Sequence, residues 1–229
     1  MEKRIYKIRA LAFDIDGTLY TNMAMYRATA LFALRHVRLF LAFGRARKLV
    51  RQEYPLQDLG ERTVELTAKE LEWDTERTRK ALQKVIYREW EQRLRSVQLC
   101  DGARELLVWL RRAGIRTAAM SDFPVAGKLS VLGLEGLWNV AFSSEETGYL
   151  KPRAEPFNRL IAELKLPAEE ILYVGNSYEY DVLGASAVGI PAAHFTWRTP
   201  RESKAVFTFS RYSDLQEWLK PRIMPAELD

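Results

Sequence analysis

Short apolar runs alternate with helix-patterned segments along most of the chain, and this alternation limits the possible folds more than any other feature. Strands are predicted at 11–13, 115–120, 139–143, 171–174, 190–195 and 206–209. Helices are predicted among them at 103–110, 125–132, 155–164, 181–188 and 214–219. Because strands that are joined through helices run parallel, the sequence predicts an α/β protein with a doubly wound parallel sheet.

A helical block interrupts this alternation directly after the first strand. Residues 23–90 carry helical periodicity with few strand signals, broken by Tyr54-Pro55 and by Leu59-Gly60. We therefore expect an α/β core formed by residues 1–20 and 99–229, and a helical cap domain formed by residues 21–98. Ligands of open α/β sheets bind beyond the carboxyl ends of the strands, so an insertion at this point is expected to cover the site as a lid.

The residue types present restrict the available chemistry. One cysteine, Cys100, excludes an internal disulfide and a cysteine-cluster metal site, and two histidines, His36 and His194, leave little room for a zinc site. We expect packing or surface roles for both histidines. No apolar run is long enough to span a membrane, and charges stand where a signal peptide needs apolar residues. The sequence thus predicts a cytoplasmic globular protein that uses carboxylates, hydroxyls and lysines.

Positive charge is concentrated in the helical block. Residues 21–98 hold 16 Lys and Arg against 10 Asp and Glu, and no acidic residue occurs between Asp16 and Glu53. A surface of one sign attracts anions such as a phosphorylated small molecule, nucleic acid or anionic lipid. The alternative is a solvated helix face without a partner. No helix-turn-helix, zinc-finger or RNP-type pattern is present in the sequence, so we do not expect nucleic acid to be the main partner.

The first strand ends in two closely spaced carboxylates, in the run Asp14-Ile15-Asp16-Gly17-Thr18. Residues i and i+2 of an extended segment point to one side, so Asp14 and Asp16 repel each other unless a cation shares them. Gly17 permits a sharp turn and a close approach of the backbone to a ligand. The alternative is an ordinary Asp-Gly turn at the end of a strand.

Four motifs at predicted strand ends together resemble one family. They are residues 13–19 (FDIDGTL), residues 118–122 (AAMSD), Lys151-Pro152 and residues 174–177 (VGNS), with Asp181 following. In this order they resemble the haloacid dehalogenase superfamily of phosphohydrolases, in its subgroup with a helical cap inserted after the first motif. The resemblance implies a Rossmann-like core. Taken alone, Ser121 is more typical of a helix N-cap or a turn hydroxyl than of a catalytic residue, and Lys151 is more typical of a solvated surface lysine.

The resemblance implies a mechanism for hydrolysis of a small phosphomonoester. Asp14 would attack phosphorus and form an aspartyl-phosphate, and Asp16 would protonate the leaving oxygen and later take a proton from water. Ser121 would hydrogen-bond a phosphoryl oxygen, and Lys151 would balance the charge of Asp14 and of the transferring group. Further phosphoryl donors would be the backbone N–H groups around Ile15, Asp16 and Asp122.

The resemblance also implies Mg²⁺ as the cofactor, bound by the Asp14 carboxylate, the Asp16 backbone carbonyl and the fourth motif. This motif usually begins with Gly-Asp in the family, whereas here it is Gly175-Asn176. Asn176 offers a neutral oxygen ligand, so we expect a weaker Mg²⁺ affinity and an acidic metal role for Asp181. The alternative is a site that has decayed.

Asp16 distinguishes among the activities of this family. True dehalogenases lack an acid at that position, so its presence favours a phosphatase acting on a small phosphorylated metabolite. A phosphonate-cleaving member needs a cap lysine as Schiff base, and nothing in the sequence marks Lys48, Lys69, Lys80 or Lys84 as activated. Two alternatives stay open: a phosphomutase, and a non-catalytic protein that binds a membrane or a partner through the basic block.

The basic block itself has two interpretations. Its arginines can grip an anionic leaving group, such as a carboxylate or a second phosphate, in a bidentate manner. Alternatively, its basic side chains lie on the outer face and contact only solvent; these are Arg35, Arg38, Arg45, Arg47 and Lys48. The apolar stretch 31–43 is expected to be a helix of the cap core, and we do not expect it to lie on a membrane.

Overall fold

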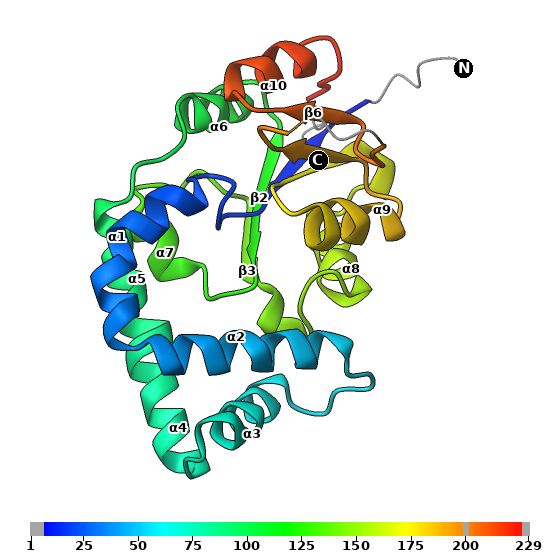
Figure 1. Ribbon diagram of the computed structural model, residues 1–229. Helices are drawn as coiled ribbons and strands as arrows, with labels where there is room; N and C mark the ends of the chain where they lie inside the picture. The colour runs from blue at the N-terminus through cyan, green and yellow to red at the C-terminus, as the bar shows by residue number, and fades with distance from the viewer. Residues whose placement is uncertain (1–6, 199–201, 226–229) are drawn as a thin grey trace.

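A six-stranded parallel sheet forms the centre of the molecule, as predicted from the sequence (Figure 1). The computed structural model describes residues 7–198 and 202–225. The strands are β1 (Ala10–Phe13), β2 (Arg116–Ser121), β3 (Val140–Ser143), β4 (Ile171–Gly175), β5 (Ala192–Phe195) and β6 (Phe207–Phe209). All neighbouring pairs are parallel, and the strand order is β3-β2-β1-β4-β5-β6. The order reverses direction between β1 and β4, so the ligand crevice is expected at the carboxyl ends of these two strands.

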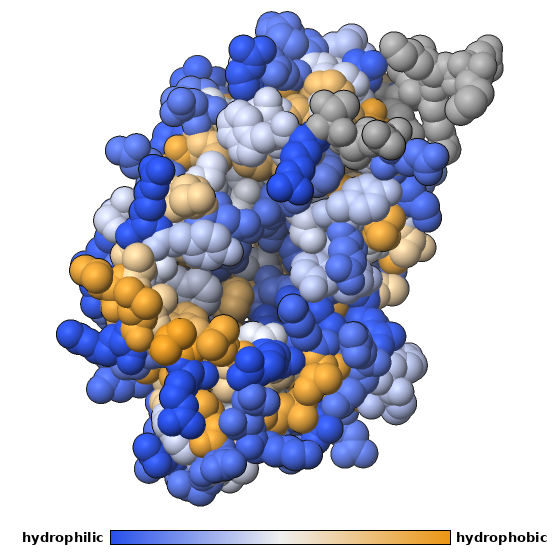
Figure 2. Space-filling model, in the orientation of Figure 1, coloured by the Kyte–Doolittle hydropathy of each residue, from blue (hydrophilic) through white to orange (hydrophobic). Residues whose placement is uncertain are grey.

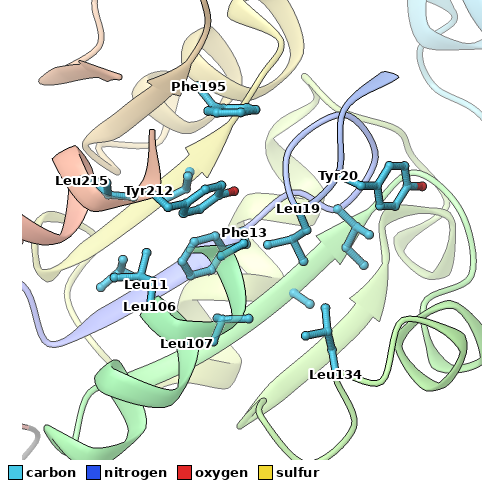
Figure 3. Packing of buried hydrophobic residues seen from close by; sticks show 14 of the residues in the cluster. Leu11, Phe13, Leu19, Tyr20, Leu106, Leu107, Leu134, Phe195, Tyr212 and Leu215 are labelled. Atoms are coloured by element: carbon cyan, nitrogen blue, oxygen red, sulfur yellow. The ribbon is translucent and has the colours of Figure 1, made fainter. Parts of the chain in front are cut away.

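Helices cover both faces of the sheet. The elements on one face are α6 (Ala103–Arg112), α7 (Ala126–Val131) and α10 (Tyr212–Leu219), and those on the other are α8 (Ala154–Leu164), the π-helical η5 (Tyr178–Leu183) and α9 (Gly184–Ala187). Successive residues of β1 point to opposite faces, so Leu11 and Phe13 pack with Leu106, as Figure 3 shows, whereas Ala10 and Ala12 pack with Phe157. The strand is therefore buried on both sides, which explains its continuous apolar run.

Residues 22–96, which lie between β1 and α6 in the chain, form a helical block. It contains α1 (Asn22–Arg35), α2 (Val37–Gln52), α3 (Leu59–Leu71), α4 (Thr75–Ala81), the π-helical η1 (Leu82–Glu89), α5 (Trp90–Arg93) and the 3₁₀ turn η2 (Leu94–Ser96). Figure 1 shows α2, α3 and α4 beyond one end of the sheet. The block has a buried apolar cluster of its own, which includes Phe32, Phe43 and Ile86.

Local signals set the helix boundaries. Side chains of Asp58 and Asp74 accept the backbone N–H groups of Glu61 and Arg77, and so cap α3 and α4. Tyr54-Pro55 separates α2 from α3, as predicted. The helix predicted from residue 181 begins earlier, at Tyr178, because the Ser177 hydroxyl accepts the N–H of Tyr180 and caps it. Two more 3₁₀ turns, η3 (Ser144–Thr147) and η4 (Ala168–Glu170), follow β3 and precede β4. Among the described residues, no helix combines the length and the apolar content that crossing a membrane requires.

Candidate active site

The carboxyl ends of β1, β2 and β4 meet around one cavity of about 160 Å³. Figure 2 shows the surface hollowed between the helical block and the rest of the molecule. The lining residues come from five separate segments: Asp14, Asp16, Arg51, Asp122, Phe123, Lys151, Asn176, Ser177, Tyr180 and Asp181. Seven of the eight residues singled out from the sequence thus line it or contact its lining, since Ser121 reaches Asp16. The eighth, Ile15, has its side chain in the core, so only its backbone is left to face the cavity.

A buried lysine joins two buried carboxylates in this cavity. Lys151 Nζ donates to Asp14 Oδ1 at 2.7 Å, to Asp181 Oδ1 at 2.6 Å and to the Tyr173 hydroxyl at 3.2 Å. Burial raises the pKa of Asp14 to about 7, against the effect of Lys151 and reinforced by Asp181 and Asp16. Burial favours neutral Lys151, but Asp14 and Asp181 outweigh it and hold the pKa of the lysine well above its ordinary value. Lys151 is therefore a buried cation and not the solvated surface lysine that the sequence alone allowed.

The second carboxylate of the first motif points to a different set of partners. Asp16 Oδ2 accepts Ser121 Oγ at 2.6 Å and Lys128 Nζ at 2.5 Å, and Asp16 Oδ1 accepts the Tyr20 hydroxyl. Burial opposes ionisation of Asp16, but Lys128 and these hydrogen bonds outweigh it and lower the pKa below its ordinary value. Two neighbouring aspartates thus have pKa values displaced in opposite directions, which is typical of sites that divide acid-base roles between carboxyl groups.

Oxygen atoms suited to a hard cation gather beside Asp14. The Thr18 hydroxyl lies 2.8 Å from Asp14 Oδ2 and 3.2 Å from Asn176 Oδ1, while Asp181 Oδ2 accepts the Ser177 N–H at 2.9 Å. Among the residues that the structure describes, no cluster of three or more His, Cys, Asp and Glu side chains forms a metal site. A cation here would need the Asn176 amide oxygen and a backbone carbonyl in addition to carboxylates, and Mg²⁺ accepts this kind of donor set.

Two glycines make the approach of these oxygen atoms possible. Gly17 has a φ of 87°, and a Cβ there would lie 2.5 Å from Asn176 Nδ2. A Cβ at Gly175 would lie 2.4 Å from side-chain atoms of Asp181. A larger residue at either position would collide with these side chains. Gly17 therefore allows Asn176 to lie against the first motif, and Gly175 allows the Asp181 side chain to lie against the end of β4. The residues present therefore fit Mg²⁺.

The carboxylate of Asp122 connects the site with the helical block. The sequence predicted a role only for its backbone N–H group. Its Oδ1 accepts Ser144 Oγ at 2.5 Å and the Lys151 N–H at 3.2 Å, and its Oδ2 accepts Arg51 Nη2 at 2.6 Å. Burial raises the pKa of Asp122, but Lys151, Arg51 and Arg47 outweigh it and lower the value to about 2. This carboxylate is therefore a fixed anion between two parts of the chain.

Each of the two interpretations of the basic block holds for some of its residues. Arg47 is buried, pairs with Glu145 and donates to the backbone carbonyl of Asp122, and Arg51 lines the cavity. The outer-face interpretation is therefore wrong for Arg47. Arg35, Arg38 and Lys48 have exposed side chains without an ion pair among the described residues, as that interpretation expects, whereas the exposed Arg45 pairs with Glu70. The burial of Arg47 could have been predicted from helical periodicity. It lies on the same face of α2 as the buried residues Leu39, Phe43, Ala46 and Val50.

Thr18, Tyr20 and Lys128 are among the residues of the site that were missed from the sequence. Thr18 and Tyr20 contact Asp14 and Asp16 because the chain turns sharply at Gly17, and Lys128 reaches Asp16 from α7. The contact of Thr18 could have been predicted, because this residue belongs to the first motif and carries a hydroxyl. No spacing rule connects Lys128 with Asp16, because the path of residues 122–125 decides whether they meet.

The cap lysines considered for a Schiff base do not reach the cavity. Lys48, Lys69, Lys80 and Lys84 are all exposed. A Schiff-base lysine is activated by removal from water, so none of the four has the required surroundings.

Comparison with known proteins identifies the family. Residues 8–189 match the model of the haloacid dehalogenase-like hydrolases, so the chain belongs to this family. It is 25% identical over 198 residues to the putative pyrophosphatase PpaX of Caldanaerobacter subterraneus subsp. tengcongensis, covering 83% of each chain. It is 28% identical over 194 residues to the phosphoglycolate phosphatase of Yersinia pestis, covering 83% of this chain and 82% of that one. The prediction of a phosphohydrolase of this superfamily is thereby confirmed.

Solved structures agree on the fold. The putative HAD-hydrolase YfnB of Bacillus subtilis, bound to magnesium, superimposes with a TM-score of 0.67 at 19% identity, covering 93% of this chain and 99% of that one. The L-2-haloacid dehalogenase of Xanthobacter autotrophicus gives a TM-score of 0.68 at 17% identity, covering 93% and 98%. At these identities the likeness concerns the fold alone, and the predicted α/β class is confirmed.

Proposed function

We propose that this chain is a Mg²⁺-dependent phosphatase that hydrolyses a small phosphomonoester through an aspartyl-phosphate on Asp14. The observation that carries the proposal is the position of Lys151 Nζ between Asp14 and Asp181 at the cavity, 2.7 and 2.6 Å from their oxygen atoms. A lysine that is charged and fixed beside the nucleophile offsets the repulsion between Asp14 and a phosphate dianion. The phosphatases among the curated relatives support the same reaction class.

The first half-reaction uses both aspartates of the first motif. An oxygen of Asp14 forms a bond to phosphorus, the bond to the leaving oxygen breaks, and Asp16 gives that oxygen a proton. A phosphate dianion near Ser121 and Lys151 raises the pKa of Asp16 by like-charge repulsion, and so favours the protonated form that this step needs. In the second half-reaction water attacks phosphorus, Asp16 takes its proton, and inorganic phosphate leaves with Asp14 restored.

Mg²⁺ would be held by Asp14, the backbone carbonyl of Asp16, Asn176 and Asp181. When bound, it neutralises charge on Asp14 and on the phosphoryl oxygens. The Thr18 hydroxyl, within hydrogen-bond distance of both Asp14 and Asn176, would orient these two ligands.

Lys128 would be a positioning residue for Asp16. It is buried, and its Nζ lies within hydrogen-bond distance of Asp16 Oδ2 and Ser121 Oγ. Together with Tyr20 it fixes both oxygens of Asp16, so the carboxyl group faces the leaving-group side of the site and not the cation.

The leaving group would enter a small cavity next to Asp16. This space of about 30 Å³ has aromatic walls from Tyr20, Trp90 and Phe123, and Lys128 lines it as well. Trp90 Nε1 is buried without a hydrogen-bond partner among the described residues. A leaving group of a few atoms that carries a negative charge or a hydrogen-bond acceptor fits these donors, with Lys128 as the cation.

The helical block would act as the cap of a two-domain enzyme, with the core at 1–20 and 99–229 and the cap at 21–98. Its own apolar cluster supports a separate unit. Ion pairs from Arg47 to Glu145 and from Arg51 to Asp122 would hold it in the closed position. The free Cys100 suits a reducing compartment, so we place the enzyme in the cytoplasm.

The test is phosphate release from a panel of small phosphomonoesters with and without Mg²⁺. We expect Mg²⁺-dependent turnover that Asp14→Asn abolishes and that the exposed control Asp101→Asn retains. Release that persists in Asp14→Asn would contradict the nucleophilic role. Transfer of phosphate to an added sugar phosphate in place of water would instead indicate a phosphomutase.

A further inference from the structure

The corner between α1 and α2 exposes a group of large apolar side chains. Leu31 is 85% exposed, Leu34 69%, Val37 45% and Leu41 54%, and all four lie within eleven residues of chain. Figure 2 shows hydrophobic atoms gathered on the surface over this part of the two helices. A cluster of this kind marks an interaction surface more often than scattered single residues do. We call these four residues the apolar corner.

The packing of the helical block does not use the apolar corner. The same two helices bury a different set of side chains, among them Phe32, Leu39 and Phe43, in the cluster of the block. Residues 31–43, predicted to form one helix of the cap core, are divided between the end of α1 and the start of α2, and they are buried on one face only. The opposite face carries apolar side chains that contact no other part of the described chain closely enough to be buried.

The charges around the apolar corner are positive. Arg27, Arg35 and Arg38 are exposed, and none of them forms an ion pair with another described residue. Arg45 does pair, with Glu70 at 2.6 Å. Since residues 17–52 contain no Asp or Glu, the helices themselves do not neutralise these cations.

We propose that the apolar corner and its arginines bind the surface of an anionic phospholipid bilayer. The apolar side chains would enter the boundary between headgroups and acyl chains, and the arginines would contact anionic headgroups. Charge decides between lipid and a second copy of the chain: two copies meeting at this corner would bring the same unpaired arginines together, whereas an anionic surface complements them.

This surface is separate from the proposed catalytic site. Arg47 and Arg51, in the C-terminal half of α2, face the cavity, while the apolar corner lies at the N-terminal end of the helix. Binding through the corner therefore leaves the cavity residues untouched, and the inference goes beyond the proposed phosphatase activity.

The experiment is flotation of the purified full chain with vesicles of phosphatidylcholine alone or of phosphatidylcholine mixed with phosphatidylglycerol. We expect at least tenfold more protein to float with the anionic vesicles and the bound fraction to fall as salt rises. The double variant Leu31→Ser/Leu34→Ser and the double variant Arg35→Gln/Arg38→Gln should each lose at least tenfold in binding. The matched control is Leu49→Ser, an exposed leucine of α2 about 18 Å along the helix from Val37, which should bind as the wild type does.

Phosphate release from a soluble substrate is measured on the same variants. Unchanged turnover in both double variants shows that they fold and that the apolar corner is separate from the proposed catalytic site. Absence of binding to anionic vesicles, or binding that both double variants retain, overturns the proposal. A dimer in sedimentation experiments that Leu31→Ser/Leu34→Ser dissociates also overturns it, because the corner is then an interface between copies.

Discussion

Lys128 Nζ lies 2.5 Å from Asp16 Oδ2, and this ion pair is separate from the one that Lys151 forms with Asp14. The site thus contains two buried lysines, each fixed to one aspartate of the first motif. Asp14 and Asp16 are two residues apart, yet they have different cations, different hydroxyl partners and pKa values displaced in opposite directions. In the proposed mechanism, this separation would give the nucleophilic role to Asp14 and the acid-base role to Asp16 before any substrate is present.

Replacing Lys128 by Met should impair substrates with poor leaving groups most. If Lys128 positions Asp16 for proton transfer, its loss lowers kcat/KM for an alkyl phosphate by roughly a hundredfold, because general acid catalysis contributes at about this scale. p-Nitrophenyl phosphate, whose leaving group needs little protonation, should lose much less. Lys128→Arg should restore part of the difference and Lys69→Met, at an exposed position, should change neither rate. Equal losses for both substrates would show that Lys128 has only a structural role.

Replacing Asp122 by Asn should destabilise the protein at neutral pH. The pKa of Asp122 is about 2 in the folded protein against an ordinary value of 3.8, so its ionised form stabilises the fold above about pH 4. The contribution, about 2 kcal/mol, is lost as the pH falls from about 4 to about 2. Urea unfolding of both proteins should therefore give a large difference at pH 7 that shrinks in acid. Asp101→Asn is the control, and a difference that stays constant with pH would contradict the assignment.

Replacing Asn176 by Asp should tighten Mg²⁺ binding. The substitution adds one negative charge beside Asp14 and Asp181 without changing the shape of the side chain, and we expect a roughly tenfold lower Kd. Calorimetric titration with Mg²⁺ in the absence of substrate measures this directly. Asn158→Asp, on the exposed side of α8, adds the same charge away from the site and should leave Mg²⁺ affinity as it is. Equal affinity in wild type and Asn176→Asp would mean that residue 176 does not contact the metal.

Replacing Gly17 by Ala should cost both stability and activity. The new Cβ must tolerate a φ of 87° and would lie 2.5 Å from Asn176 Nδ2. Gly136 has a φ of 70° with no atom within 4 Å of a Cβ, so Gly136→Ala isolates the backbone cost, about 1 kcal/mol. We expect a larger loss of unfolding free energy for Gly17→Ala and a lower kcat, with kcat unchanged in Gly136→Ala. Similar effects of the two variants on both quantities would show that contact with Asn176 is unimportant.

The sheet and the first motif could be predicted because their signals are local. A strand that is buried on both faces has a continuous apolar run, as β1 and β4 do, and the polar residues that follow it lie at the same edge of the sheet. Asp14 and Ser121, at the ends of β1 and β2, could therefore be expected to meet without knowledge of any loop, whereas Lys151 and Asp181 were expected there from the family resemblance.

The remaining site residues depend on contacts that the sequence does not encode locally. Lys128 reaches Asp16 only because the chain after Ser121 turns back over the first motif. Arg51 and Asp122 meet only because the end of α2 lies above β2. The burial of Arg47 and the exposure of Arg45 could be predicted in part, because helical spacing places them on different faces of α2. The partners of Arg47 could not be predicted.

One carboxylate oxygen of Asp122 accepts the backbone N–H of Lys151, and the other accepts Arg51 of the helical block. A movement of the block that admits substrate must release Arg51, and it then leaves the backbone at Lys151 with a looser anchor. We expect the rigidity of Lys151 to vary with the position of the proposed cap, and amide hydrogen exchange at residues 149–151 to report it. If the helical block is the cap proposed above, each turnover would include one loosening and one tightening of the backbone at Lys151.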